Sequence, residues 1–147
     1  MDTYYPYIFD VNTYVKGDPT ITALAGEEIK IYPLVGYEES DSPFILYWWM
    51  PGNMSRDMYF VRVDYLRYHV LDIDAERGLK VQEALLDRLN LGDTIQGLVP
   101  SDTARILWAV ELRSGTGAFN AGLGAPRERE GFYEFQLNFE IGYVPLS

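Results

Sequence analysis

The most constraining feature of this chain is an uninterrupted block from Phe44 to Leu91 that reads as strand, turn, long strand and capped helix. Its first run, Phe44–Met50, is apolar at every residue and rich in β-formers, which is typical of a strand covered on both faces. Pro51, Gly52 and Asn53 then end that strand. The block predicts a sheet with a helix packed against it.

A long second strand is predicted from Met58 to Leu71. Apolar residues alternate with Arg62 and Asp64 as far as Tyr65, and the alternation changes phase at Leu66. A shift of one residue exchanges the two faces of a strand, so a β-bulge near these residues is the simplest way to keep one face buried. We therefore expect a bulge there and a curved sheet.

The block ends in an amphipathic helix that Asp74 is suited to cap and that Asn90-Leu91-Gly92 is suited to stop. One apolar stripe of this helix contains a single polar residue, Gln82, and predicts the side that packs on the sheet. The stripe consists of Ala75, Leu79, Val81, Leu85, Leu86 and Leu89. The opposite side has mixed charge and is expected to be solvated. Its residues are Glu76, Lys80, Glu83 and Asp87.

Shorter elements surround this block. Residues Ile8–Ala25 are expected to form one or two short helices broken near Pro19, with Asp18 or Thr20 as the second cap. Strands are predicted over Ile29–Val35, over Ala104–Arg113, and over Tyr133–Tyr143, where apolar and polar residues alternate cleanly.

Together these elements predict one α+β domain over residues 1–147. The expected architecture is a mostly antiparallel, curved sheet of about four to five strands, with a long helix packed on one face and short N-terminal helices. Residues 114–131, between the last two strands, hold five glycines and no periodic pattern, so they are expected to project as a hairpin loop. Loops of this length are usually either functional or disordered.

Composition excludes several classes of protein. The chain has no cysteine, which rules out disulfides, thiol catalysis and cysteine-ligated zinc. Its one histidine, His69, lies on the polar side of a strand and is more often a surface residue than a ligand in such a place. The net charge of −10 argues against a groove that grips nucleic acid by neutralising phosphates. Without a secretory signal or an apolar run near the ~18 residues of a membrane span, a soluble protein made in a cytoplasm is expected.

Motifs that would indicate chemistry are nearly absent. The glycines of the 114–131 loop match neither a dinucleotide-binding nor a phosphate-binding pattern. Asp72 and Asp74 sit at a strand-to-helix turn where two carboxylates can bind Mg²⁺ or Ca²⁺, but a cap and a solvated acid explain them without a metal. We therefore predict no catalytic residue, no cofactor and no metal ligand, and a protein that is not an enzyme.

Aromatic residues make up 15% of the chain, including 12 tyrosines. Tyrosine and tryptophan bury a large apolar area and keep a polar tip, so they are enriched where proteins meet. The cluster of Tyr4, Tyr5 and Tyr7 fits either a contact surface or a well-packed core.

The order of elements resembles one family, the tail terminator proteins of tailed bacteriophages, also called tail completion or tail-to-head joining proteins. Members have N-terminal helices and a strand with a proline, an apolar run and a tyrosine, here Pro43–Tyr47. A long strand follows, here Tyr59–Leu71, and then a helix that crosses the sheet, here Asp74–Asn90. The last strand alternates like Gly131–Ile141, and the resemblance covers about Thr20 to Tyr143.

This resemblance implies a structural virion protein that forms a ring, commonly of six copies, at the head-proximal end of a phage tail. Such a ring terminates the tail tube and joins it to the neck or head, so the implied partners are further copies of the chain, the tail tube protein and a neck or head-completion protein. DNA passes through the ring without specific binding, and the acidic balance suits such a channel. The implied location is the virion, after synthesis in the host cytoplasm.

Ring closure needs one surface to fit a different surface of the next copy, so contact residues are the expected functional residues. They are expected in the loop before Phe44, in the 114–131 loop and in its charged return leg. The candidates are Glu38, Glu39, Asp41, Phe119, Arg127, Glu128, Arg129 and Glu130. Arg127 and Arg129 are expected to pair with acidic residues of a neighbour.

Other classes of protein remain open from the sequence alone. One is a small soluble α+β binding module that recognises a peptide or a metabolite, and another is a different head–tail connector or neck protein. The third is an enzyme that uses only carboxylates and tyrosines, with Asp72, Asp74 or Glu38 as its acids.

Overall fold

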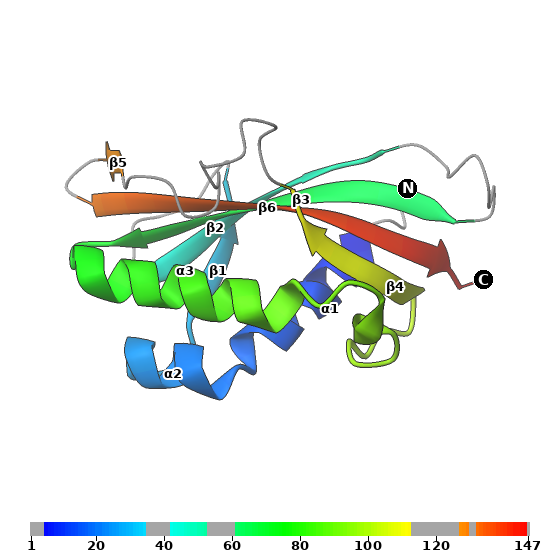
Figure 1. Ribbon diagram of the computed structural model, residues 1–147, viewed down its shortest axis with the longest axis horizontal. Coiled ribbons are helices and arrows are strands. Elements are labelled where there is room, and N and C mark those ends of the chain that lie inside the picture. The colour runs from blue at the N-terminus through cyan, green and yellow to red at the C-terminus, as the bar shows by residue number, and fades with distance from the viewer. Residues whose placement is uncertain (1–4, 35–41, 53–60, 113–126, 130–131, 147) are drawn as a thin grey trace.

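The structure, a computed structural model, describes residues 5–34, 42–52, 61–112, 127–129 and 132–146. The elements in chain order are α1 (Tyr5–Lys16), α2 (Pro19–Ala25), β1 (Lys30–Pro33), β2 (Phe44–Met50), β3 (Arg62–Asp72), α3 (Ala75–Leu89), the short 3-10 helix η1 (Asp93–Ile95), β4 (Ala104–Glu111), β5 (Arg127–Arg129) and β6 (Phe132–Pro145). The strands form one layer, and α1, α2 and α3 lie together on one face of it (Figure 1). This arrangement confirms the predicted α+β fold class.

The sheet is mixed. Its strand order is β1-β2-β3-β6-β4, and β5 pairs with β6 outside this path. β1 runs parallel to β2, with Lys30 opposite Phe44, whereas the other pairings are antiparallel. The expectation of a mostly antiparallel sheet needs this one correction. The direction in which a four-residue edge strand joins a sheet depends on contacts distant in sequence, which a local pattern does not encode.

The N-terminal segment forms two helices, as predicted. α2 has Asp18 as its N-cap, because the carboxylate accepts a hydrogen bond from the Ile21 N–H at 3.0 Å, and Pro19 occupies the first helical position. Gly26 ends α2 with a φ of 81°, a left-handed conformation that glycine adopts at low cost. The inner side of α1 is buried through Tyr7, Ile8, Val11 and Val15.

α3 begins and ends where the sequence predicts. The Asp74 carboxylate accepts hydrogen bonds from the backbone N–H groups of Glu76 at 3.1 Å and Arg77 at 3.2 Å, and Asn90 is the C-cap. These contacts use two of the N–H groups that have no partner within a helix.

The buried side of α3 is rotated relative to the predicted stripe. Leu79 is 37% exposed, whereas Gln82 is fully buried and donates from Nε2 to the Gln136 carbonyl at 2.9 Å. A buried amide is tolerated because it has this partner. Gly78 also faces the sheet, and a Cβ there would lie 2.6 Å from Phe135 Cε2, so glycine permits a close approach of helix and sheet.

β3 runs without a bulge, so the bulge predicted near Tyr65 and Leu66 is wrong. Its register with β2 and with β6 is continuous along the strand. The side facing the helices is buried at Asp64, Leu66, Tyr68 and Val70, with Asp64 in an inward position that the alternation pattern assigned to solvent. The irregular register lies instead in β4, between Ile106 and Trp108.

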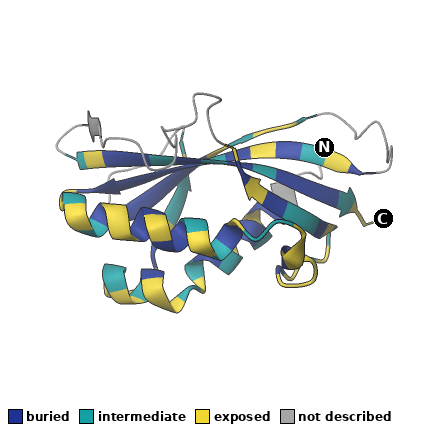
Figure 2. Ribbon diagram, viewed as in Figure 1, coloured by how far each residue is buried: buried dark blue, intermediate teal, exposed yellow. Residues whose placement is uncertain are grey.

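The main core lies between the sheet and the helices, where buried residues from α1, α3, β2, β3, β4 and β6 form one cluster. Buried residues line the strands and the inner sides of the helices, and exposed residues lie on the outer sides of the helices (Figure 2). A second, smaller cluster contains Phe44, Leu46 and Leu71. Side chains alternate along a strand, so this cluster lies on the sheet face opposite the helices, which we call the outer face.

Only the first half of β2 is covered on both faces, which corrects the prediction for this strand. Phe44, Ile45, Leu46 and Tyr47 are buried, but Trp48 is 43% exposed and Met50 is 44% exposed. An apolar run does not reveal where along the strand its cover ends.

His69 is also not a surface residue. It is 4% exposed, on the outer face of β3, and its Nδ1 lies 2.9 Å from Glu134 Oε2 on β6. His69, which was expected at a solvent-exposed position, is therefore a buried residue that contacts a carboxylate.

Candidate interaction surface

The predicted contact residues fall mostly outside the described part of the chain. This holds for Glu38, Glu39, Asp41, Phe119 and Glu130. Arg127, Glu128 and Arg129 form β5, whose backbone pairs with the start of β6, with Arg127 opposite Glu134 and Arg129 opposite Phe132. The role of all eight residues in contacts stays a prediction.

On the outer face, exposed apolar side chains lie next to one another on β2, on β3, on β4 and at Leu112, which directly follows β4. In one row Met50 lies opposite Tyr65, Tyr65 opposite Glu140, and Glu140 opposite Val110. In the next row Trp48 lies opposite Arg67 and Arg67 opposite Asn138, whose carbonyl accepts from the Leu112 N–H at 2.8 Å. We call the following residues the outer patch: Trp48, Met50, Tyr65, Arg67, Val110 and Leu112.

Arg67 is the only cation of the outer patch. Its guanidinium carbon lies 4.4 Å from the centre of the Trp48 ring, in a cation–π arrangement. Its Nε is buried and has no hydrogen-bond partner, and no ion pair joins Arg67 to a carboxylate of the described residues. The guanidinium therefore retains donors that can bind a carboxylate from outside the described part of the molecule.

The neighbouring Trp108 borders the patch on β4. Its indole N–H donates to Glu140 Oε2 at 3.0 Å, and its ring lies over Gly142, where an added Cβ would come within 2.1 Å of the indole. Glu140 is thus held by the indole. Gly142 provides the space in which Trp108 lies flat on the sheet.

The composition of the outer patch is typical of a protein contact. Tyrosine, tryptophan, methionine and arginine are enriched in the centres of interfaces. The exposed apolar members are Trp48, Met50, Tyr65, Val110 and Leu112, between 37% and 44% exposed. The outer patch was not predicted from the sequence, because Phe44–Met50 is apolar throughout and predicts a strand covered on both faces along its whole length.

The described sheet edges are less suited to contacts than the outer face. On β4, Ala109 exchanges two backbone hydrogen bonds of 3.1 Å with Gly92, and the Glu111 N–H donates to Asn90 Oδ1 at 2.8 Å. At the other edge β1 has four residues and ends at Pro33. Short edge strands, proline and covered N–H groups all discourage pairing with another strand.

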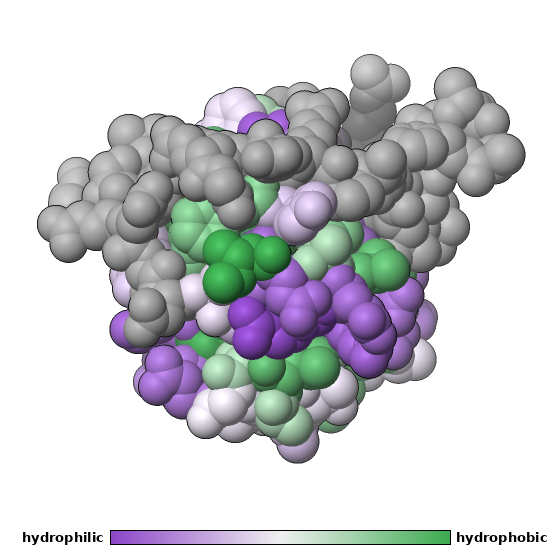
Figure 3. All heavy atoms as spheres, turned by 90° about the vertical axis from the view of Figure 1, so that its left-hand side faces the viewer, coloured by the Kyte–Doolittle hydropathy of each residue, from purple (hydrophilic) through white to green (hydrophobic). Residues whose placement is uncertain are grey.

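A different surface, on the exposed side of α3, is acidic. Glu83 and Asp87 are exposed there and form no ion pair with a described residue, whereas Glu76 pairs with Lys80 at 3.2 Å. Leu79 and the half-buried Leu86 share their side of the helix because of the spacing of three and four residues. We call Leu79, Glu83, Leu86 and Asp87 the acidic stripe. Figure 3, which views the end of the molecule where α3 begins, shows hydrophilic residues as a belt between hydrophobic ones.

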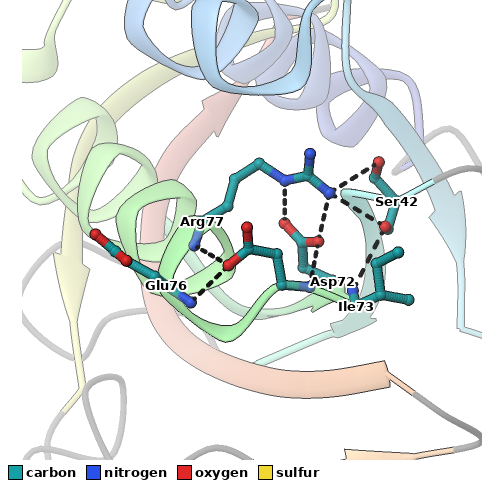
Figure 4. Close-up of polar contacts among 6 residues, drawn as sticks. Ser42, Asp72, Ile73, Glu76 and Arg77 are labelled. Carbon is teal, nitrogen blue, oxygen red and sulfur yellow. Dashed lines mark hydrogen bonds and ion pairs between the residues drawn. The ribbon is translucent and has the colours of Figure 1, made fainter.

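Asp72 and Asp74 are both used within the fold, at the turn between β3 and α3. Asp72 is fully buried and accepts from Arg77 Nε and Nη2 at 2.7 Å each, and from the Asp74 N–H at 2.9 Å (Figure 4). Arg77 Nη2 also donates to the Ser42 hydroxyl at 3.3 Å, and hydrogen bonding to Asp72 raises the pKa of Arg77. This cluster fastens the start of α3 to the start of β2, which explains both carboxylates without a metal.

A second buried carboxylate, Asp64, fastens α1 and the end of β2 to β3. Oδ2 accepts from the Tyr7 hydroxyl at 2.6 Å and from Trp49 Nε1 at 2.9 Å, and Oδ1 accepts from the Gly52 N–H at 2.9 Å. The Tyr7 ring also stacks on Tyr143, with centroids 4.2 Å apart. Asp64 is as buried as catalytic acids often are, but it accepts hydrogen bonds from three groups of the fold, so its role is structural.

Two buried tyrosines have raised pKa values. For Tyr7 the cause is burial first and then the charge of Asp64 and the hydrogen bond to it, and for Tyr68 it is burial first. Both phenols therefore stay protonated in the folded chain at pH values at which an unfolded tyrosine, with a pKa of about 10, ionises.

The free energy of unfolding should consequently fall as the pH rises above about 10. A folded-state pKa above the unfolded value gives stability that is complete below the unfolded pKa and declines above it, here by about 1.4 kcal/mol per pH unit for each phenol. Urea unfolding at a series of alkaline pH values would measure this slope. Tyr68→Phe should make the slope shallower, and an unchanged slope would show that Tyr68 ionises in the folded chain.

Within the part of the chain that the structure describes, no group of three or more histidine or acidic residues could hold a metal ion. None of the described helices is both long and apolar enough to cross a membrane.

No protein-family model matches the chain, and no curated protein matches it. Among solved structures, it is similar to a chain of one described as "Virion of native gene transfer agent (GTA) particle", with a TM-score of 0.65 and 16% sequence identity. The alignment covers 92% of this chain and 92% of that chain. At this identity the likeness is one of fold.

Proposed function

We propose that this chain is a structural virion protein of a phage-like particle, acting as a ring at the head-proximal end of the tail. The observation that carries the proposal is the likeness in fold to a chain of a gene transfer agent virion over 92% of both chains. In this role the ring, commonly of six copies, terminates the tail tube and joins it to a neck or head-completion protein.

Two further features support a structural role. The outer patch has the composition of a protein contact surface, as a protein that binds copies of itself and neighbours in a particle requires. The two most buried acidic anchors, Asp64 and Asp72, hold elements of the fold together and leave no carboxylate free for general acid–base chemistry at those positions. The proposal therefore includes no catalytic step and no cofactor.

The net charge of −10 suits the proposed location. A ring on the path of DNA benefits from a surface that does not attract phosphate groups, and an acidic chain provides one. In this role DNA passes through the ring without specific binding.

The proposal is tested by native mass measurement and negative-stain electron microscopy of the purified chain over a range of concentrations. The expected result is closed rings with a central hole and, for six copies, a mass six times the 16.9 kDa of the chain. In purified particles, an antibody against the chain should label one position, at the junction of head and tail. Label spread along the tail or over the head would contradict the proposal and indicate another virion role. A monomer with no label in the particles would contradict it and favour a small binding module.

A further inference from the structure

The outer patch and the acidic stripe are complementary in charge, and both carry exposed apolar side chains. The outer patch offers Arg67, with no carboxylate partner among the described residues, within a surround of exposed apolar side chains. The acidic stripe offers the opposite charge, since Glu83 and Asp87 form no ion pair with a described residue and lie beside Leu79, which is 37% exposed, and the half-buried Leu86. The two surfaces therefore differ in the charge that they offer, since Glu140, the carboxylate between Tyr65 and Val110, already accepts the indole N–H of Trp108.

The two surfaces lie on opposite sides of the molecule. α3 covers one face of the sheet, and the outer patch is on the other face (Figure 1). They cannot meet within one chain, but they can meet between two chains arranged head to tail. Such a heterologous contact, repeated with a rotation that closes, generates a ring.

We infer that the outer patch of one copy binds the acidic stripe on α3 of a second copy, with Arg67 pairing with Glu83 or Asp87. This inference rests on the proposed function, because it names the surfaces through which neighbours in the proposed ring touch. An isologous contact between two outer patches would instead leave Arg67 without the Glu83 and Asp87 carboxylates.

The guanidinium is suited to this contact for two reasons. Its planar fork binds a carboxylate through two parallel hydrogen bonds, and stacking on Trp48 at 4.4 Å holds it in place before the partner arrives. Docking of the stripe would also cover Trp48, Met50 and Tyr65, so that the ion pair lies within an apolar surround. Arginine and tryptophan in such a setting commonly contribute most of the binding energy of an interface.

The absence of cysteine from the chain makes the test direct, because any disulfide must form between introduced residues. Val110→Cys is on the outer patch and Glu83→Cys is on the acidic stripe, so a mixture of the two variants under mild oxidation should give a mixed disulfide dimer. Glu28→Cys is the matched control, since Glu28 is an exposed acidic residue before β1, outside the stripe. It should give little mixed disulfide with Val110→Cys.

Charge reversal provides the second measurement. Arg67→Glu should weaken self-association by about tenfold or more, because it would leave the carboxylate of Glu83 or Asp87 desolvated and without a cation. Lys30→Glu, which changes the charge equally at the β1 edge, should leave self-association unchanged. Combining Arg67→Glu with Glu83→Arg or Asp87→Arg should restore it in at least one of the two double variants.

The outcomes separate this inference from the proposed function. If rings form but Val110→Cys and Glu83→Cys give no mixed disulfide, and if the rings also survive Arg67→Glu, the inference is overturned and the proposed ring remains. If the mixed disulfide forms but the antibody does not label the head–tail junction, the inference is supported and the proposed function is contradicted. A disulfide of Val110→Cys with itself alone, or no disulfide at any concentration, overturns the inference.

Discussion

Asp64→Ala should lower the free energy of unfolding by about 3–5 kcal/mol. The substitution leaves the Tyr7 hydroxyl, the Trp49 indole N–H and the Gly52 N–H without the acceptor that they share at 2.6 to 2.9 Å. A buried donor that loses its partner costs about 1–3 kcal/mol. Asp64 is 3% exposed, so water replaces the carboxylate poorly. Urea denaturation followed by circular dichroism would measure the loss.

Three variants show whether this loss comes from the hydrogen bonds. Asp87→Ala removes an exposed carboxylate from α3 and should change the free energy of unfolding by no more than about 0.5 kcal/mol. Tyr7→Phe removes one donor and should cost about 1 kcal/mol. The double variant of Tyr7→Phe and Asp64→Ala should cost less than the sum of the two single changes, because the two groups interact directly. A loss below about 1 kcal/mol for Asp64→Ala would contradict the role of Asp64 as an anchor.

Asp72→Ala should lower the free energy of unfolding by about 2–3 kcal/mol, less than Asp64→Ala. Asp72 is fully buried and bonds two guanidinium nitrogens of Arg77 at 2.7 Å and the Asp74 N–H at 2.9 Å. The Arg77 side chain is 32% exposed, so water hydrates the guanidinium when its partner is removed. This solvation reduces the loss relative to a pair that is buried on both sides.

A double-mutant cycle with Arg77→Ala tests the same contact. The combined variant should be more stable than the sum of the single losses predicts, by about 1–2 kcal/mol. Each single change leaves one charged side chain without its partner, whereas the double change removes both side chains. Additive losses would show that the two side chains contribute independently. Asp72→Asn should fall between the wild-type chain and Asp72→Ala, because it keeps an acceptor for the Asp74 N–H.

The candidate surface was predicted less well than the fold. The expected contact residues lie in loops, and most of them are outside the described part of the chain. The outer patch was missed because a run such as Phe44–Met50 is apolar whether a second layer covers it or not. Only the burial of individual side chains shows that the cover ends at Tyr47, so that Trp48 and Met50 are exposed.

Buried polar residues are the main place where sequence and structure differ. From the sequence, Asp64 was expected on the solvated side of its strand, and Gln82 was the one polar residue on the apolar stripe of its helix. Both are buried in the structure. Each has partners far away in the chain: Tyr7 is 57 residues from Asp64, and Gln136 is 54 residues from Gln82. A polar side chain can be buried when such a partner exists, and a local pattern does not contain that information.

The sequence by itself determined the parts of this protein that depend on neighbours a few residues apart. Asp74 as a helix cap, Asp18 as one of two candidate caps, the bounds of α3 and the alternation along most of β6 were predicted, because capping and periodicity act within a turn or a strand. The start of β6 departs from the predicted alternation, since Tyr133 is exposed and Glu134 is buried. The tertiary structure alone decided the parallel direction of β1, the rotation of α3 on the sheet and the burial of Asp64. It also decided which half of β2 remains exposed, because these features follow from contacts between residues that are distant in the chain and close only in the folded state.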